Sequence, residues 1–194
     1  MIRRIELSKL VRKQLKKVPR HIVENLAAWV DDVENRGLEE TRKTAGYHDE
    51  PLHGKRLGQR SIRLSRTYRA VYVLRKDGSG EFVSVEEMSN MSTKVKSDTM
   101  KYLEQTAGRP LTLGGLLESI RLGEEMSQAA FARKLRVSAS HLCDIEKGRK
   151  VVSPERAARF ARTLGRSAEQ FVRLSLQEMV DEAGLKMKVD VAAA

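Results

Sequence analysis

The opening segment of the chain has apolar positions that predict one short strand followed by two helices. Residues 3–7 alternate between apolar and polar types, as in a strand. Ser8 is a candidate N-cap for a helix that follows at once, and Pro19 stands where a second helix would begin. Apolar residues then recur at helical spacing until Gly37. This pattern predicts a helical hairpin.

The apolar period changes to two beyond a polar stretch. Residues 39–58 are polar and contain several Gly and Pro residues, so we expect a long loop there, or a loop with a short strand. Apolar residues alternate over 62–74 and again over 82–85, with a turn sequence at 77–80 between them. The first half is therefore expected to be an α+β domain in which the helical hairpin packs on a small antiparallel sheet.

A polar, aperiodic stretch separates this half from a second one. Residues 91–112 are expected to be a linker, with a possible short helix near 100–105. Nearly every segment beyond it has helical spacing. We therefore expect one domain over 1–90, an all-α domain over 113–183 and a strand-like tail over 184–194.

The all-α domain is expected to contain about five helices, because cap residues divide it. Serines precede most of the apolar-periodic segments, and glycines follow several of them. The candidate caps are Ser127, Ser138, Ser153 and Ser167, and the candidate helix ends are Gly123, Gly148 and Gly165. Residues 185–191 alternate strictly, so they form either a strand that awaits a partner edge or a frayed terminus.

Composition narrows the class of protein. The chain has 194 residues, of which 40% are hydrophobic and 32% charged, so it can bury a core. No apolar run approaches the roughly 20 residues that span a bilayer, and the first residues do not resemble a secretory signal. Cys143 is the only cysteine, which excludes an internal disulfide framework and a cysteine-rich zinc module. We expect a soluble, cytoplasmic protein without a membrane partner, a metal or a cofactor.

Net charge adds a class of partner. The formal charge is 37 − 26 = +11, and both halves share it, with 19 − 13 = +6 over residues 1–90 and 18 − 13 = +5 over 91–194. A basic excess of this size favours a polyanionic partner, and nucleic acid is the first candidate. Solubility alone is the alternative explanation.

The strongest motif lies in the second half. Residues 127–148, SQAAFARKLRVSASHLCDIEKG, combine a short helix, a turn and a second capped helix, with Phe131, Leu135 and Leu142 on a shared apolar seam. This unit resembles the helix-turn-helix of Cro/CI phage repressors, also called the Xre type, over residues 113–164. The alternative is a helical interaction module that has lost DNA binding.

The resemblance implies a set of DNA-binding residues. In such domains the second helix enters the major groove, and its N-terminal side chains reach base edges. Phosphate contacts come from the start of the preceding helix and from cations beyond the recognition helix. The expected set is Gln128, Ser138, Ala139, Ser140, His141, Asp144, Lys147, Arg149 and Lys150. His141 either reads a base or is merely solvated.

A second resemblance lies in the first half. Residues 52–75, LHGKRLGQRSIRLSRTYRAVYVLR, place Lys and Arg around alternating apolar positions, so one sheet face would pack on the hairpin and the other would present guanidinium groups. With the preceding helices, the Leu-x-Gly, Ile-Arg-Leu and Tyr-Arg-Ala-Val-Tyr motifs resemble the RelE/HigB superfamily of toxins over about residues 3–86. That resemblance implies a ribosome-dependent messenger-RNA endonuclease.

The implied chemistry drives a ribose 2′-OH onto the adjacent phosphate. Cations stabilise the charge of the transition state, while a base and an acid move the protons. By motif position, Arg63 and Arg69 match the catalytic cations, although a solvated sheet face is the alternative. Lys55, Arg56 and Arg60 are the expected contacts to RNA phosphates.

The sequence departs from this family after the last strand, where members commonly carry a His or Arg and a Tyr. Residues 86–91 read EEMSNM and contain none of these types, and Tyr102 lies far into the expected linker. His48 and His53 are candidates to substitute, although two loop histidines are more often ordinary surface residues. We therefore expect the nuclease activity of the intact chain to be masked or impaired.

Both halves fit one interpretation. A RelE-like toxin followed by an Xre-type antitoxin is the HigB–HigA order, so we interpret the chain as a toxin–antitoxin fusion that binds operator DNA and represses its own transcription. The expected partners are operator DNA, a second copy of the chain, and messenger RNA on the ribosome if the toxin half is active. The toxin–antitoxin contact would form within one chain or be swapped between chains. The alternatives are an active endonuclease and a plain transcriptional regulator with an inactive RelE-like domain.

Overall fold

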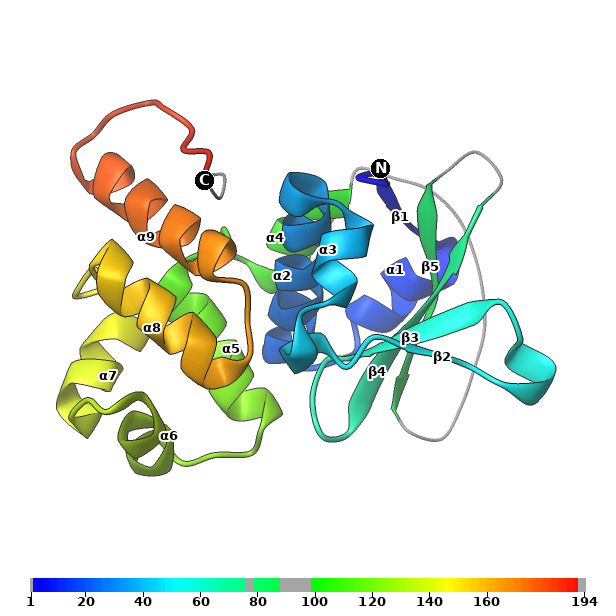
Figure 1. The fold of residues 1–194 in the computed structure, drawn as a ribbon, viewed down its shortest axis with the longest axis horizontal. Helices are drawn as coiled ribbons and strands as arrows, with labels where there is room; N and C mark the ends of the chain where they lie inside the picture. Colours follow the sequence, from blue (N-terminus) through cyan, green and yellow to red (C-terminus); the bar gives the residue numbers. More distant parts are fainter. Residues whose placement is uncertain (1, 76–78, 88–98, 192–194) are drawn as a thin grey trace. The chain divides into compact units, whose positions relative to one another are not determined.

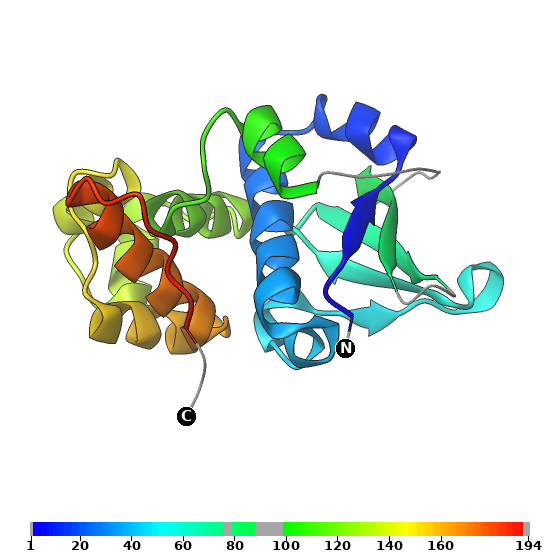
Figure 2. The same cartoon turned by 90° about the horizontal axis from the view of Figure 1, so that it is seen from above.

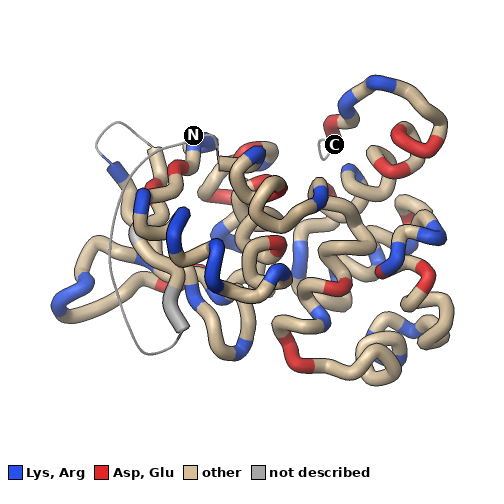
Figure 3. The backbone as a smooth tube through the Cα atoms, turned by 180° about the vertical axis from the view of Figure 1, so that it is seen from behind, with Lys and Arg blue, Asp and Glu red and all other residues tan. Residues whose placement is uncertain are grey.

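The computed structural model describes residues 2–75, 79–87 and 99–191. The chain divides into two compact units, Met1–Pro110 and Leu111–Ala194, which confirms an α+β region followed by an all-helical region. Figure 1 shows both units as ribbons, and Figure 3 marks the Lys and Arg positions that each contains. No helix among the described residues is long and apolar enough to cross a membrane.

The N-terminal unit is built on a five-stranded sheet with the order β1-β5-β4-β3-β2. The strands are β1 (Ile5–Leu7), β2 (Glu50–Pro51), β3 (Gln59–Arg63), β4 (Tyr68–Leu74) and β5 (Gly80–Glu87). Four of them are antiparallel as predicted, but β1 pairs parallel to β5. The helices that follow β1 supply the long crossover that a parallel neighbour requires. Of the expected turn at 77–80, Asp77 and Gly78 lie outside the described residues.

The predicted helical hairpin covers one face of this sheet, as Figure 2 shows. It consists of α1 (Lys9–Leu15) and α2 (Arg20–Arg36), which are followed by the short α3 (Leu38–Arg42). The hydroxyl of Ser8 accepts a hydrogen bond from the Val11 backbone N–H, which confirms the predicted cap. Trp29 of α2 is fully buried, and its ring centroid lies 5.2 Å from those of Tyr72 and Phe82. The core of the unit therefore lies between α2 and the sheet.

The polar stretch expected as a loop is more ordered than predicted. It holds α3, two 3-10 turns (Ala45–Tyr47 and Gly54–Arg56) and β2. Tyr47 is buried, and its hydroxyl donates a hydrogen bond to the carbonyl of Ala28 in α2. One aromatic side chain thus anchors the stretch to the helical hairpin.

The stretch expected as a linker contains part of the N-terminal core. Helix α4 (Thr99–Ala107) packs on α2, and both Leu103 and Ala107 belong to the hydrophobic cluster of the unit. The N-terminal unit accordingly extends to Pro110 rather than to residue 90. The low overall hydropathy of this segment hid two apolar residues that are four positions apart on one helix face.

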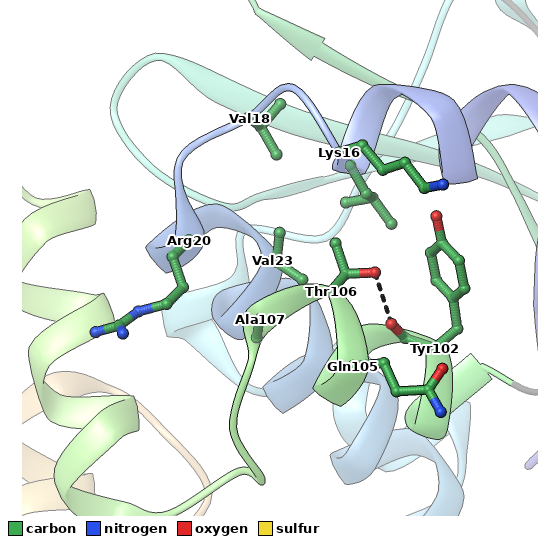
Figure 4. Close-up of a pocket in the computed structure, with 9 residues that line it drawn as sticks. Lys16, Val18, Arg20, Val23, Tyr102, Gln105, Thr106 and Ala107 are labelled. Carbon is green, nitrogen blue, oxygen red and sulfur yellow. Dashed lines mark hydrogen bonds between the residues drawn. The ribbon is translucent and has the colours of Figure 1, made fainter.

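Polar contacts also hold α4 in place. The hydroxyl of Tyr102 donates to the Arg12 carbonyl at 2.6 Å, and the Arg12 guanidinium lies 4.6 Å from the centre of the same ring. Beyond the helix, Arg109 pairs with the buried carboxylate of Glu24 at 2.6 Å. A hollow of about 520 Å³ remains beside α4, and Figure 4 shows Tyr102 among its lining residues.

The C-terminal unit consists of five helices over its described residues, 111–191. They are α5 (Leu113–Gly123), α6 (Gln128–Leu135), α7 (Ala139–Glu146), α8 (Pro154–Leu164) and α9 (Ala168–Glu182). The four predicted serine caps are confirmed, because each hydroxyl accepts from the N–H three residues on.

The strand expected over 185–191 does not form. This segment instead folds back on α9, where the side-chain amide of Gln177 donates to the Met187 carbonyl at 2.9 Å and accepts from the Val189 N–H at 2.8 Å. A lone alternating segment needs a partner edge to become a strand, and here the side chain of a helix binds its backbone groups instead.

Candidate nucleic-acid interfaces

Helices α6 and α7 are joined by a tight turn whose geometry follows from the sequence. The turn begins at Arg136, which has φ 56° and ψ 48° and caps the C-terminus of α6. Ser138 then caps α7 by accepting from the His141 N–H at 3.1 Å. Phe131, Leu135 and Leu142 are buried, so the predicted apolar seam between the two helices is confirmed. The first turn of α7 is exposed at Ala139 and Ser140.

A buried carboxylate fixes α7 against the two preceding helices. Glu146, at the end of α7, pairs with Arg121 of α5 through two bonds of 2.7 and 3.0 Å. The Gln128 side chain at the start of α6 donates to the same carboxylate at 2.8 Å. This pairing raises the pKa of Arg121. The orientation of α7 is therefore set by an ion pair in the interior of the unit.

Gln128 has a partner that the sequence did not suggest. Its amide was predicted to donate to a DNA phosphate, whereas one of its N–H groups is already bonded to Glu146. An amide nitrogen carries two N–H groups, so the second can still reach a ligand.

Three of the predicted DNA-binding residues form one cluster at the C-terminal end of α7. The Asp144 carboxylate lies 2.7 Å from the Arg149 guanidinium and 3.0 Å from the Lys150 ammonium. Hydrogen bonds from Arg149 first, and then from Lys150, hold the pKa of Asp144 below its usual value. More than half of the side-chain surface of both cations stays exposed, at 54% and 53%. Lys147, which follows α7 directly, is exposed as well.

His141 makes a contact that defines its protonation state. Its Nε2 lies 2.7 Å from a guanidinium nitrogen of Arg156 in α8. A guanidinium only donates, so this ring nitrogen accepts and the imidazole is neutral. Burial lowers the pKa of His141, and the positive charges of Arg156 and Lys150 lower it further. In the free protein His141 therefore orients Arg156, and its role toward DNA stays a prediction.

Sequence reasoning missed three cations near the start of α7. Arg136, Arg156 and Arg159 line a solvent-open concavity of about 410 Å³ together with Lys150, and we call this concavity the basic hollow. Its remaining lining residues are Val137, Ser138, Ser140 and His141. A signal was available for two of these cations, because Arg156 and Arg159 are three residues apart and share a face of the predicted helix.

In the N-terminal unit, the two predicted catalytic cations do come together. Arg63 of β3 and Arg69 of β4 are direct cross-strand partners. The preceding pair, Ile62 and Ala70, is buried in the core against the helices. Side chains alternate between the two faces of a sheet, so both arginines belong to the face away from the helical hairpin. Arg63 also donates to the Ser65 carbonyl at 3.2 Å.

The predicted RNA-binding residues do not join that pair. Arg60 lies on the opposite sheet face, where it bonds the buried Asp49 at 2.7 Å. The same carboxylate accepts from the Tyr72 hydroxyl at 2.8 Å. Burial first, and then the charge of Asp49, raise the pKa of Tyr72. Arg60 is therefore part of a structural network.

Lys55 and Arg56 lie neither on the sheet face of Arg63 and Arg69 nor on the opposite face with Arg60. They occupy the 3-10 turn of the β2–β3 connection, which projects from the sheet in Figure 1. The five cations predicted for RNA are thus divided among three places.

The residues considered as acid or base are also apart from the Arg63–Arg69 pair. His48 and His53 are exposed in the stretch before β3. Tyr102 bonds the Arg12 carbonyl as part of α4. The segment in which the sequence departs from the RelE pattern lies outside the described residues from Met88 onward.

Comparison with known families supports the helix-turn-helix resemblance of the second half of the chain. Residues 112–174 match a family model described as a helix-turn-helix domain, which starts at the Thr112 N-cap of α5 and ends within α9. Comparisons of the chain with curated proteins and with solved structures gave no match. Together with the geometry of α6 and α7, the family match shows that the C-terminal region contains a helix-turn-helix domain.

Proposed function

We propose that this protein is a transcriptional regulator that binds operator DNA through its C-terminal unit. Two features of α7 carry this proposal: its first turn is exposed, and the helix as a whole is followed by the exposed cations Lys147, Arg149 and Lys150. A helix fits the major groove, and polar side chains in its first turns can reach base edges. Cations that flank such a helix neutralise backbone phosphates.

The reading face of α7 has a defined chemistry. Ser140 and Asp144 are four residues apart, so they share one face of the helix. A hydroxyl both donates and accepts, whereas an ionised carboxylate only accepts. In the major groove, a carboxylate would pair with the amino group of cytosine. Arg149 and Lys150, which hold Asp144 in the free protein, would then turn to phosphates.

We further propose that the N-terminal unit is a RelE/HigB-like domain, so that the chain is a toxin–antitoxin fusion. The helical hairpin on a small sheet and the Arg63–Arg69 pair on its other face support this proposal. Tethering would keep the antitoxin at about millimolar effective concentration, so a modest interface would suffice to neutralise the toxin. The chain is expected to act as a homodimer, since regulators of this type bind paired half-sites about one helical turn apart.

A second candidate function is messenger-RNA cleavage by the N-terminal unit. Two arginines directly opposite each other on one sheet face could bind a phosphate between them. Expression of the full chain and of its Arg69→Ala variant in a bacterial host separates the cases. Growth inhibition and message cleavage that Arg69→Ala relieves would establish the nuclease, and equal growth would leave the unit as a docking or regulatory fold.

DNA binding is tested with the duplex that lies upstream of the gene. The variant Arg149→Ala with Lys150→Ala should weaken binding by roughly 10-fold or more, because two phosphate contacts are lost. Lys186→Ala with Lys188→Ala removes the same charge from the exposed tail beyond α9 and serves as the matched control. Equal affinities of the two double variants would refute the assignment of the interface.

A further inference from the structure

The basic hollow is a concentration of positive charge at the start of α7. It is formed by four parts of the C-terminal unit: the α6–α7 turn, the first turn of α7, the loop after α7 and the first half of α8. Four cations line it, and of these Lys150 is paired with Asp144, which is not among the lining residues. No acidic side chain is among the described residues that line the hollow. Like charges repel one another in the absence of a counter-ion. The arrangement therefore favours an anion inside the hollow.

One of these cations occupies a strained position in the backbone. Arg136 adopts φ 56°, a left-handed conformation that favours glycine. The equivalent cap of α8 in the same unit is Gly165, with φ 64° and the same pattern of hydrogen bonds to the end of its helix. The fold therefore accepts glycine in this kind of turn and carries an arginine at the hollow instead. His48 and Glu125 share this conformation, so it assigns no role by itself, but at Arg136 it sets a cation in the wall of the hollow.

The other walls suit a phosphate in particular. The first N–H groups of α7 have no partner within the helix, and the helix dipole favours a negative charge at this end. The hydroxyls of Ser138 and Ser140 lie 3.2 Å apart at the same place. Neutral His141 holds the Arg156 guanidinium at the rim of the hollow. Oxygen atoms of a phosphate would find several donors from different directions.

We propose that the basic hollow is a phosphate-binding site and that the phosphate belongs to the DNA backbone. The second part of this inference rests on the proposed function. The hollow adjoins Ser140, which lies on the reading face of α7, so a duplex whose major groove holds α7 would bring a backbone strand to it. Arg136 and Arg159 would then fix the register of the recognition helix on the duplex, without reading sequence.

The full-length protein and a fluorescent duplex of random sequence provide the test, since phosphate contacts do not depend on sequence. Arg136→Gly should keep or raise the melting temperature, because it relieves backbone strain. The same variant should weaken duplex binding roughly 3- to 10-fold and lower the slope of log K against log salt by about 0.9, the value for one phosphate contact. Arg159→Ala should lower the duplex affinity and the salt slope by similar amounts, whereas Lys186→Ala should change neither the affinity nor the slope.

A second arm separates the two sources of phosphate. Inorganic phosphate is compared with chloride at equal ionic strength, with the melting temperature as the readout. An Arg136→Gly variant that matches the wild type in duplex affinity and in salt slope would overturn the DNA backbone as the ligand. If the wild-type protein binds no duplex, the proposed function fails, and the hollow survives only as a site for free phosphate. That site requires inorganic phosphate to stabilise the wild type more than Arg136→Gly, and equal stabilisation would overturn it.

Discussion

The two units differ in what they do with positive charge. The N-terminal unit, Met1–Pro110, carries 23 − 15 = +8, and the C-terminal unit, Leu111–Ala194, carries 14 − 11 = +3. Yet the less basic unit is the one that matches the helix-turn-helix family model. In the N-terminal unit, arginines pair with buried carboxylates, as Arg75 does with Glu6 and Glu81 and Arg109 does with Glu24. In the C-terminal unit, Arg121 likewise pairs with the buried Glu146, but other cations lie exposed around the short helix α7: Arg136, Arg149, Lys150 and Arg159.

This difference shows that net charge alone identifies neither a surface nor a partner. A guanidinium that neutralises a buried carboxylate contributes to folding, and its charge is largely cancelled. A guanidinium beside an exposed acceptor costs little to release, so it remains available for a phosphate. The placement of each cation relative to the nearest carboxylate is therefore more informative than the net charge of the unit.

The largest expected effect separates structural from binding arginines. Arg75→Met removes the arginine paired with Glu81 and one of the two arginines paired with Glu6, the other being Arg4. The two glutamates lie directly opposite each other on β1 and β5, and their side chains are 0% and 1% exposed. The loss of one partner of a buried pair costs about 3–5 kcal/mol. Denaturant unfolding followed by circular dichroism should show this loss in the N-terminal unit, while duplex binding persists. Arg149→Met should weaken duplex binding and leave the unfolding free energy nearly unchanged. A similar loss of stability in both variants would contradict the comparison.

The next effect concerns α4. Leu103→Ala opens a cavity in the core of the N-terminal unit and should lower its unfolding free energy by about 2–5 kcal/mol. Gln105→Ala, at an exposed position of the same helix, is the matched control and should change it little. Equal stabilities of the two variants would show that the segment is a linker after all.

A smaller effect concerns the arginine pair on the sheet face away from the helical hairpin. Arg69→Thr removes a charge at a position whose cross-strand partners are Arg63 and Glu86, and Thr is favoured in strands. The unfolding free energy should therefore change by no more than about 0.5 kcal/mol in either direction. Chemical denaturation measures this value. A loss well above that size would make Arg69 a structural residue, and its match to a catalytic position would then lose its meaning.

The smallest effect is a pH dependence in the C-terminal unit. Glu178 of α9 accepts from the Leu113 N–H at 2.6 Å, and burial raises its pKa above the usual value near 4.5. The folded state therefore binds the carboxyl proton of Glu178 more tightly than the unfolded state does. The free energy of unfolding that this proton contributes is lost as pH rises through the raised pKa. The melting temperature of Glu178→Gln minus that of the wild type should increase between pH 4.5 and 7. A constant difference would contradict the raised pKa.

Local signals in the sequence predicted much of this fold. Ser8, Ser127 and Ser138 were recognised as caps, because a cap depends on a residue and the three that follow it. The parallel pairing of β1 and the packing of α4 depend on residues far apart in the chain, and local periodicity does not report them. The tail alternates like a strand, but Gln177 binds its backbone groups before any edge does.

The candidate sites follow the same division. The parity of a strand already places Arg60 and Arg63 on opposite faces, so their separation was predictable from the sequence. The bond between Arg156 and His141 was not, because it joins two helices across the unit. The sequence places Arg136 in the predicted turn between two helices, but only the structure shows its left-handed conformation.

The most direct test of the central claim is a ratio of two affinities measured by fluorescence anisotropy at physiological salt. The full-length protein is titrated against the duplex from upstream of its own gene and against a random duplex of equal length. A transcriptional regulator is expected to prefer its operator by roughly 1,000-fold or more. A ratio near one would show a basic protein that binds nucleic acid without selecting a site, and it would contradict the proposed function.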